Sequence, residues 1–330
     1  MEAPDLPPGE IHRPVMPAEV LELLNLKPGM TAVDSTLGLG GHSELMAKLI
    51  SPGGTLLGLD RDLAAIEIAR NRLKPYSSQI RIITRHTEFS RLDAVLQELQ
   101  DEGEKIAIDA GLIDAGASSL QMDHAPGFSF RRNDFLDGRM NRTGSEPTVA
   151  DIIATSTEQQ LANILWELGD ERHSRRIARA LVEARTKQGP ITTTGQLVQI
   201  IERAVPRSDW PTEKHVATKS MQALRVACNG EMEQLQAGVN SIIDNLIPGG
   251  RIAVISFQSQ EDRIVKDIFM RRSGRTPAPS GMSIAALAMP DPGNAADLRV
   301  ITRKPLLPTD AEVRENPRAR SARLRGAEKI

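Results

Sequence analysis

A short segment near the start of the chain combines a carboxylate with clustered glycines. It reads Val33-Asp-Ser-Thr-Leu-Gly-Leu-Gly-Gly-His-Ser43, an apolar run that ends in an acid and leads into a helical pattern. Glycines at such a turn let a ligand approach the backbone closely, and the start of the helix offers free N–H groups. A second acid, Asp60, ends the next apolar run and could accept hydrogen bonds from both hydroxyls of a ribose. These residues predict a nucleoside-cofactor site.

One position distinguishes a dinucleotide from other nucleoside cofactors, namely the third glycine of the dinucleotide-binding pattern. In the dinucleotide pattern G-x-G-x-x-G this glycine would stand at position 43, which is Ser43. S-adenosylmethionine fits better, because it has no pyrophosphate and carries an amino-acid end that needs polar partners such as Asp34. A turn with a purely structural role is the alternative, since a glycine turn alone is weak evidence. The two acids favour the cofactor.

A second polar turn follows the fourth apolar run and reads Leu112-Ile-Asp-Ala-Gly-Ala-Ser-Ser-Leu-Gln121. Ligands of open parallel sheets bind at the carboxyl ends of the strands, so Asp114 should face the cofactor. Considered alone, the turn is more typical of a strand end in which Asp114 and Ser118 bond to the backbone.

These residues need a sheet to position them, and the first third of the chain predicts one. Short apolar runs at 30–33, 55–59, 80–83 and 112–113 alternate with helical patterns at 44–50, 63–73 and 91–100. Such alternation is typical of an α/β fold with a parallel sheet covered by helices on both faces.

The strand pattern stops after residue 120 and returns with the apolar run 251–257. Between them lies a loop-rich stretch followed by three helical patterns, the third with possible N-caps at Thr192-Thr-Thr194. We therefore expect a discontinuous domain of residues 1–120 and 213–330 with an inserted helical domain of residues 121–212. The runs 282–289 and 298–302 are expected to complete the sheet, and 305–330 to form a coil tail.

Composition excludes several classes of protein. The 330 residues are 40% apolar and 25% charged, as in ordinary globular proteins, with 41 basic and 43 acidic side chains. The single cysteine, Cys228, excludes an internal disulfide and a cysteine-built zinc site, and no metal site is predicted. No apolar run approaches the ~20 residues of a membrane span, and no secretory signal is recognisable. We expect a cytoplasmic protein that does not bind membranes.

Read together, these segments resemble the bacterial 16S rRNA cytosine-N4 methyltransferase family (RsmH/MraW). The motifs that carry the resemblance follow one another in the family's order over nearly the whole chain. They are His12-Arg-Pro-Val15, Asp34 to Ser43, Leu59-Asp-Arg-Asp62, Gly127-Phe-Ser-Phe130, Leu136-Asp-Gly-Arg-Met140, Pro190 to Thr194, Gln222 to Val226, Ile255 to Lys266 and Asn316 to Ser321. The resemblance implies a Rossmann-like class I methyltransferase sheet with an inserted all-helical domain. It also implies that S-adenosyl-L-methionine donates a methyl group to the exocyclic N4 of a cytosine in 16S rRNA of the small ribosomal subunit.

The resemblance further implies which residues contact the cofactor. They are Gly40, Gly41, His42, Asp60, Phe89, Asp114 and Gln121. Phe89 and Gln121 come from the resemblance alone, and the residue pattern by itself favours Phe89 as a core aromatic. No general base is assigned, because the Ser/Asp-Pro-Pro-Tyr loop of DNA amino-methyltransferases is absent.

Several positions depart from the family pattern. Gln258 stands where the family has a histidine, Gly138 replaces a methionine, and Ala115 and Ala117 are smaller than usual. These departures keep open an alternative function, a catalytically weak paralogue that binds rRNA as an assembly factor. A nicotinamide-dependent oxidoreductase is the other alternative, and Ser43 counts against it.

Two basic clusters are candidates for RNA contact. The first lies in the helical insertion and comprises Arg172, Arg175, Arg176, Arg179, Arg185 and Lys187. Its first four members are spaced to share one helix face, where they would meet either RNA phosphates or the acids of neighbouring helices. The second comprises Arg318, Arg320, Arg323 and Arg325 in the expected tail. The oligomeric state, monomer or homodimer, is left open.

Overall fold

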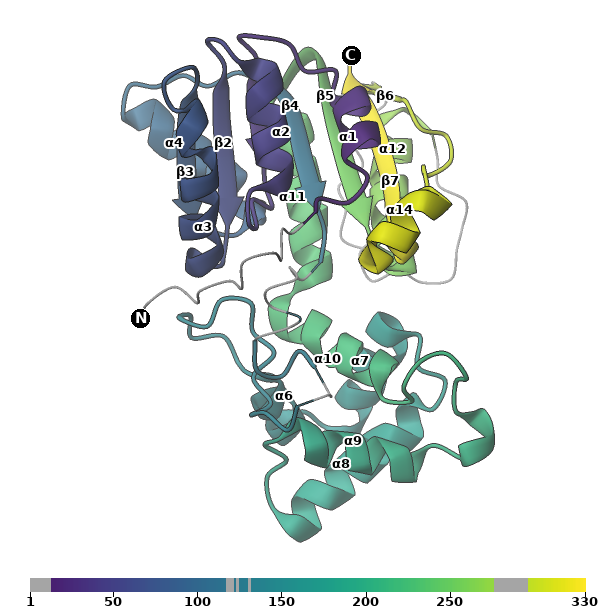
Figure 1. Cartoon of the computed structure of the whole chain (residues 1–330). Coiled ribbons are helices and arrows are strands. Elements are labelled where there is room, and N and C mark those ends of the chain that lie inside the picture. The colour runs from purple at the N-terminus through teal and green to yellow at the C-terminus, as the bar shows by residue number, and fades with distance from the viewer. Residues whose placement is uncertain (1–12, 117–121, 123–124, 130–131, 276–295) are drawn as a thin grey trace. The chain divides into compact units, whose positions relative to one another are not determined.

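The chain divides into two compact units. The computed structural model describes residues 13–116, 122, 125–129, 132–275 and 296–330. Residues 1–116 and 232–330 form one unit, called here the sheet unit, and residues 117–231 form the other, called the helical unit. Figure 1 traces the chain through both.

The sheet unit is built on a mostly parallel sheet of seven strands in the order β3-β2-β1-β4-β5-β7-β6. The strands are β1 (Thr31–Asp34), β2 (Thr55–Asp60), β3 (Arg81–His86), β4 (Ile108–Asp114), β5 (Leu246–Ser256), β6 (Leu298–Val300) and β7 (Arg323–Lys329). The five strands from β3 to β5 run parallel, and β7 pairs antiparallel with β5 and with β6. The predicted α/β fold class is thereby confirmed, and the chain order reverses between β1 and β4.

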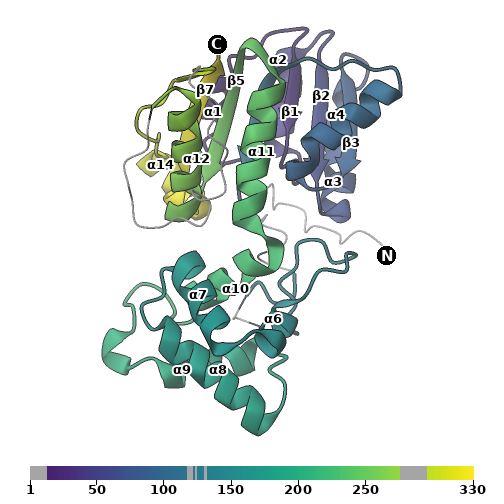
Figure 2. The same cartoon turned by 180° about the vertical axis from the view of Figure 1, so that it is seen from behind.

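Helices cover both faces of this sheet. Figure 1 shows α1 (Pro17–Leu24), α2 (Gly41–Ile50) and α3 (Leu63–Leu73) in front of the strands, and Figure 2 shows α4 (Leu92–Asp101), α11 (Glu231–Asn245) and α12 (Ser259–Arg272) on the opposite face. Short elements complete the unit, namely α14 (Asp310–Glu315) and the 3-10 turns η1 (Lys74–Tyr76), η2 (Phe89–Arg91) and η4 (Pro317–Ser321). Sequence sets these boundaries locally: Asp62 caps α3 by accepting hydrogen bonds from the N–H groups of Ala64 and Ala65.

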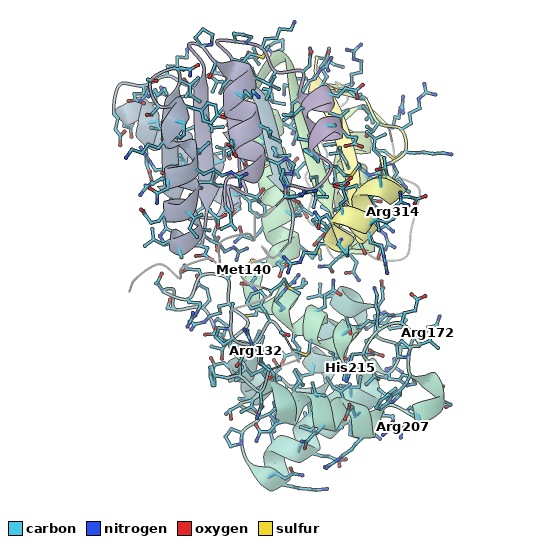
Figure 3. All side chains as sticks on the ribbon, viewed as in Figure 1. Arg132, Met140, Arg172, Arg207, His215 and Arg314 are labelled. Atoms are coloured by element: carbon cyan, nitrogen blue, oxygen red, sulfur yellow. The ribbon has the colours of Figure 1, made fainter. Side chains whose placement is uncertain are left out.

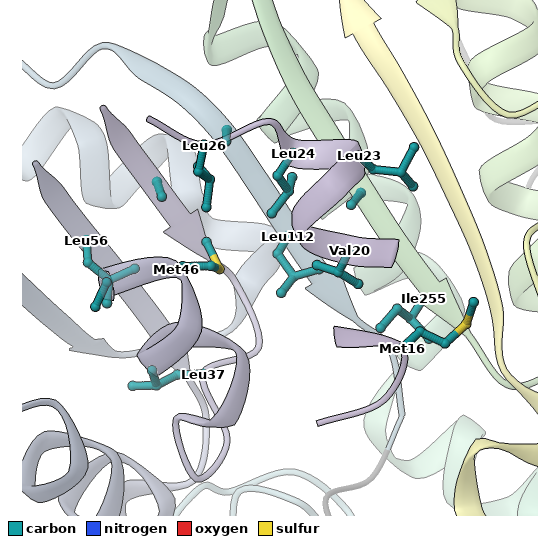
Figure 4. Packing of buried hydrophobic residues seen from close by; sticks show 14 of the residues in the cluster. Met16, Val20, Leu23, Leu24, Leu26, Leu37, Met46, Leu56, Leu112 and Ile255 are labelled. Carbon is teal, nitrogen blue, oxygen red and sulfur yellow. The ribbon is translucent and has the colours of Figure 1, made fainter. Parts of the chain in front are cut away.

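The core of the front layer lies between α1, α2 and the central strands. Met16, Val20 and Met46 are fully buried and belong to one apolar cluster with Leu112 of β4 and Ile255 of β5 (Figure 4). Because the strands are buried on both faces, their apolar runs are nearly continuous, which is why they could be recognised in the sequence.

The expected coil tail at 305–330 is wrong. Residues 323–329 form β7, which lies inside the sheet between β5 and β6, and α14 precedes it. Arg325, which was expected to be available for RNA, is buried in β7 and donates two hydrogen bonds to Asp262 of α12, the shorter one 2.6 Å long. Arg318 and Arg320 remain exposed. The predicted strand at 298–302 is confirmed as β6, whereas the run 282–289 lies outside the described residues.

The described part of the helical unit contains no strand of the main sheet. Its elements are α6 (Val149–Thr155), α7 (Glu158–Gly169), α8 (Ser174–Gln188), α9 (Thr194–Ala204), η3 (Arg207–Asp209) and α10 (Thr218–Asn229). Thr193 caps α9 in a capping box with Gln196, as the threonine run suggested. The unit ends at Glu231 and not at 212, because α10 packs against α7 and contributes Met221 and Leu224 to its apolar core.

Only some members of the first basic cluster lie on one face of a helix. α8 begins at Ser174, so Arg172 precedes the helix, although Figure 3 places its side chain at the surface of the helical unit. Arg179 lies 3.7 Å from Glu158, and Arg185 donates to the backbone oxygen of Ile153. Arg175 and Arg176 are exposed and have no ion-pair partner within the described chain. The expected four-arginine stripe therefore reduces to three free cations around the start of α8.

No helix in the described ranges is long and apolar enough to span a membrane.

Candidate cofactor site

Three aspartates lie at the carboxyl ends of adjacent strands. Asp34 ends β1, Asp60 ends β2 and Asp114 ends β4, and these strands are neighbours in the sheet. The point where the strand order reverses, between β1 and β4, is the usual ligand site of an open α/β sheet. The structure therefore brings together the acids on which the predicted cofactor site depends.

The glycine-rich turn is fixed to the second of these acids. The N–H of Gly38 donates to one carboxylate oxygen of Asp60 at 2.7 Å, and the N–H of Asp62 donates to the other at 2.8 Å. Gly40 has a φ of 78°, a left-handed conformation that favours glycine, and precedes the first residue of α2. Within the described chain no side chain caps α2, so its first N–H groups can receive an anionic ligand group.

Asp34 holds the turn together from within. It is 1% exposed and accepts hydrogen bonds from the Ser43 hydroxyl at 2.7 Å and from the Thr36 N–H at 3.2 Å. Burial raises its pKa to about 6, although these hydrogen bonds oppose the rise. Ser43, which interrupts the dinucleotide pattern, thus has a structural role here.

Asp114 connects the glycine-rich turn to β4. Its N–H donates to the Thr36 hydroxyl at 2.7 Å, and its carboxylate lies 3.7 Å from the His42 ring. Burial raises the pKa of Asp114 to about 8, and the neighbouring carboxylates of Asp34 and Glu261 add to the rise. At neutral pH this carboxyl therefore carries its proton for most of the time.

Phe89 lies at the carboxyl end of β3, in η2. A side chain at position 238 of α11 would collide with the Phe89 ring, so the ring lies directly against the backbone of Gly238. The end of β3 is joined to β2 by a hydrogen bond from the Thr87 N–H to the Asp60 backbone oxygen at 2.9 Å. Phe89 thus follows by two residues a position that is bonded to the acid expected at the ribose, whereas Gln121 lies outside the described residues.

The arrangement fits a nucleoside cofactor with an amino-acid end. One carboxylate oxygen of Asp114 and the Ser35 hydroxyl are buried and have no hydrogen-bond partner in the described part of the chain. Buried polar atoms are rarely left unpaired, so both are available to polar groups of a ligand. In the same ranges no three His, Cys, Asp or Glu side chains cluster in a way that could hold a metal ion.

Glu261 is a buried acid beside the site that the sequence did not single out. It is 2% exposed and accepts hydrogen bonds from the N–H groups of Phe257 and Gln258 at the start of α12. The Gln258 amide donates to the same carboxylate at 3.1 Å, so the residue that replaces the family histidine helps to cap this helix. A capping signature, Gln258 with Glu261 three positions later, was the signal that could have found it.

Comparison with known proteins identifies the family of this chain. The model of the MraW methylase family matches residues 9–330. The chain belongs to the MraW methylase family. Among relatives, the ribosomal RNA small subunit methyltransferase H of Geobacter sulfurreducens is 46% identical, covering 97% of this chain and 99% of the relative. The protein of the same name from Pelobacter propionicus is 42% identical, covering 97% and 98%.

A solved structure described as an rRNA methylase from Streptococcus thermophilus has a TM-score of 0.41 to this chain at 10% identity, covering 95% of this chain and 93% of that one. The assignment to the MraW methylase family depends on the family match and the relatives, and not on this overlap.

The raised pKa of Asp114 gives this MraW methylase a testable pH dependence. A carboxyl that binds its proton more tightly when folded makes the free energy of unfolding fall as pH rises from its unfolded to its folded pKa. We expect the thermal midpoint, followed by far-UV circular dichroism, to fall between about pH 6.5 and about pH 8.5, above the range in which Asp34 titrates. Asp114→Asn should flatten this decline, and a variant with the wild-type slope would contradict the assignment.

Proposed function

We propose that this protein methylates the exocyclic N4 of a cytosine in 16S rRNA of the small ribosomal subunit, with S-adenosyl-L-methionine as methyl donor. The observation that carries the proposal is the match to the MraW methylase family over residues 9–330, together with relatives named ribosomal RNA small subunit methyltransferase H. The cytosine and its N4 come from the sequence resemblance. The cofactor is supported by the acids and the free polar atoms at the carboxyl edge of the sheet.

Each proposed cofactor residue has a distinct task. Asp60, held by two backbone N–H groups, keeps lone pairs for the ribose hydroxyls. Gly40 and Gly41 let the amino-acid end approach the start of α2, and His42 with Asp114 supplies polar groups beside it. Phe89 provides an apolar face for the adenine. The seventh proposed contact, Gln121, is placed by the resemblance alone.

When bound, the sulfonium supplies an electrophilic methyl group. The chain must hold the acceptor amine in line with it, because the N4 lone pair is delocalised into the cytosine ring and the amine is a weak nucleophile. It must also let the N4 proton leave, and we assign no side chain to that task. The positively charged donor can react without a strong base if the proton departs after the transfer.

We assign recognition of the RNA substrate to the helical unit, where the cations at the start of α8 are placed to contact phosphates. Arg172, Arg175 and Arg176 are exposed, and the described chain offers them no acidic partner. The last two stand in the first turn of α8, where the helix dipole disfavours positive charge. Because an RNA phosphate would offset this repulsion, the arrangement favours a binding role over a purely structural one.

Charge reversal at α8 should reduce RNA affinity. We expect Arg175→Glu with Arg176→Glu to weaken binding to small-subunit particles and to lower the slope of log affinity against log salt by about 0.7–0.9 for each lost phosphate contact. Arg203→Glu with Lys214→Glu is the matched control, since it reverses two exposed charges elsewhere in the helical unit. Filter binding at several salt concentrations measures both. Equal slopes for the two double variants would show that the α8 cations do not contact RNA.

The proposed activity is tested by methyl transfer to partly assembled small subunits. Labelled S-adenosylmethionine should transfer its label to 16S rRNA, and nuclease digestion with mass spectrometry should locate it on N4 of a single cytosine. Label on another base or another atom would contradict the proposed specificity. Tight binding to the particles without transfer would favour the alternative function, an assembly factor with weak or no catalysis.

A further inference from the structure

The amide oxygen of Gln234 is a buried hydrogen-bond acceptor. It lies one helical turn from Gly238, the glycine that packs against the Phe89 ring. Gln234 and Gly238 are four residues apart on α11 and therefore share a helix face. Gly238 contacts the Phe89 ring, and the Gln234 amide nitrogen donates to the carboxylate of Glu88, the residue before Phe89. Two adjacent residues before α4 thus pack on two adjacent turns of α11.

The orientation of the Gln234 amide is fixed by this contact. A carboxylate only accepts hydrogen bonds, so the amide nitrogen must point towards Glu88 and the amide oxygen away from it. That oxygen is buried and has no hydrogen-bond partner within the described chain. A buried acceptor without a donor is costly and rare, so this oxygen is available to a donor group of a ligand.

The chemistry of the missing donor follows from the surroundings. An aromatic ring packed one helical turn from a lone acceptor matches a flat heterocycle with an amino group at its edge. If Phe89 lies beside the adenine, as proposed above, the 6-amino group is the donor that the adenine offers to the Gln234 oxygen.

We propose that the Gln234 amide oxygen accepts a hydrogen bond from the 6-amino group of the cofactor and so selects adenine over 6-oxopurines. The inference depends on the proposed cofactor. Glu88 acts as a positioning residue, because it holds the amide with its oxygen free. Gly238 acts by leaving room for the ring of Phe89.

Two ligands that differ in the purine 6-substituent, and with it in the proton on the adjacent N1, test the proposal. S-adenosylhomocysteine carries the 6-amino group, and S-inosylhomocysteine carries an oxygen there, which would face the Gln234 oxygen and repel it. Isothermal titration should give the wild-type protein a preference of about tenfold or more for the adenosyl ligand. Gln234→Met keeps the length of the side chain but removes the acceptor, and it should abolish most of that preference by weakening the adenosyl ligand alone.

Two further variants separate the possible outcomes. Gln236→Met, two residues further along α11, should keep the preference. Glu88→Gln can donate as well as accept, so it no longer fixes the orientation of the Gln234 amide and should reduce the preference. Equal binding of both ligands to the wild type would overturn the inference while leaving the proposed cofactor intact, whereas binding of neither would refute the cofactor itself. If Gln234→Met weakened both ligands equally, Gln234 would have a structural role and the inference would be overturned.

Discussion

Replacing Asp60 with alanine is expected to weaken S-adenosylmethionine binding by about 1.5–3 kcal/mol, which raises the dissociation constant roughly 10- to 150-fold. The reason is the loss of hydrogen bonds between a carboxylate and two ribose hydroxyls. The carboxylate is held in place before the ligand arrives, because each oxygen already accepts a backbone N–H. Titration calorimetry of the wild type and the variant measures the difference directly.

A neighbouring aspartate provides the control for this result. Asp62 lies in the same turn and caps α3, but it is not expected to contact the ribose. Asp62→Ala should lower the thermal midpoint through loss of the cap, which typically costs about 0.5–2 kcal/mol, while cofactor affinity changes little. Equal affinity losses in the two variants would mean that Asp60 acts only by ordering the turn.

The second large effect is expected at the buried ion pair of Arg325 and Asp262. Asp262→Ala leaves the Arg325 guanidinium buried, with 8% of its side chain exposed and no carboxylate to accept its hydrogen bonds. Removing one partner of such a pair typically costs about 3–5 kcal/mol. We expect a loss of this size in the free energy of unfolding of the sheet unit.

The measurement must report on the correct unit. Both tryptophans, Trp166 and Trp210, belong to the helical unit, so their fluorescence does not follow the sheet. Hydrogen exchange of the β5 and β7 amides in urea is the suitable readout. Asp262→Ala with Arg325→Met should regain much of the lost stability, because no unpaired charge remains. If the single variant keeps full protection of these amides, the pair contributes little to holding β7 in the sheet.

The strands β1, β2, β4 and β5 could be predicted because most of their central side chains are buried on both faces and form short apolar runs. β7 could not be predicted in the same way. Its sequence, Arg323-Leu-Arg-Gly-Ala-Glu-Lys329, resembles a basic tail, and its central arginine is compatible with burial only because Asp262 lies across from it. A partner 63 residues away leaves no local signal in the sequence.

In the candidate site, too, residues whose role depends on distant partners could not be predicted from the sequence. Asp60 and Asp114 were predictable, since an acid at the end of a buried strand has a known place in an open α/β sheet. Thr36, Glu261 and Gln234 were missed because their importance lies in what they contact. Thr36 bonds to Asp114, Glu261 raises its pKa, and Gln234 meets Glu88 across 146 positions of the chain.

The position of β7 inside the sheet also affects how the chain can fold during synthesis. The helical unit is continuous in sequence and is complete before β5 leaves the ribosome, whereas β7 begins roughly 70 residues after β5 ends. At a synthesis rate of about 5–20 residues per second, the edge of β5 that pairs with β7 stays unpaired for roughly 3–14 seconds. The unpaired edge of an apolar strand, which is buried in the finished sheet, is prone to pair with other chains. The nascent protein is therefore expected to need shielding at β5, the strand beside the cofactor site, for longer than at any part of the helical unit.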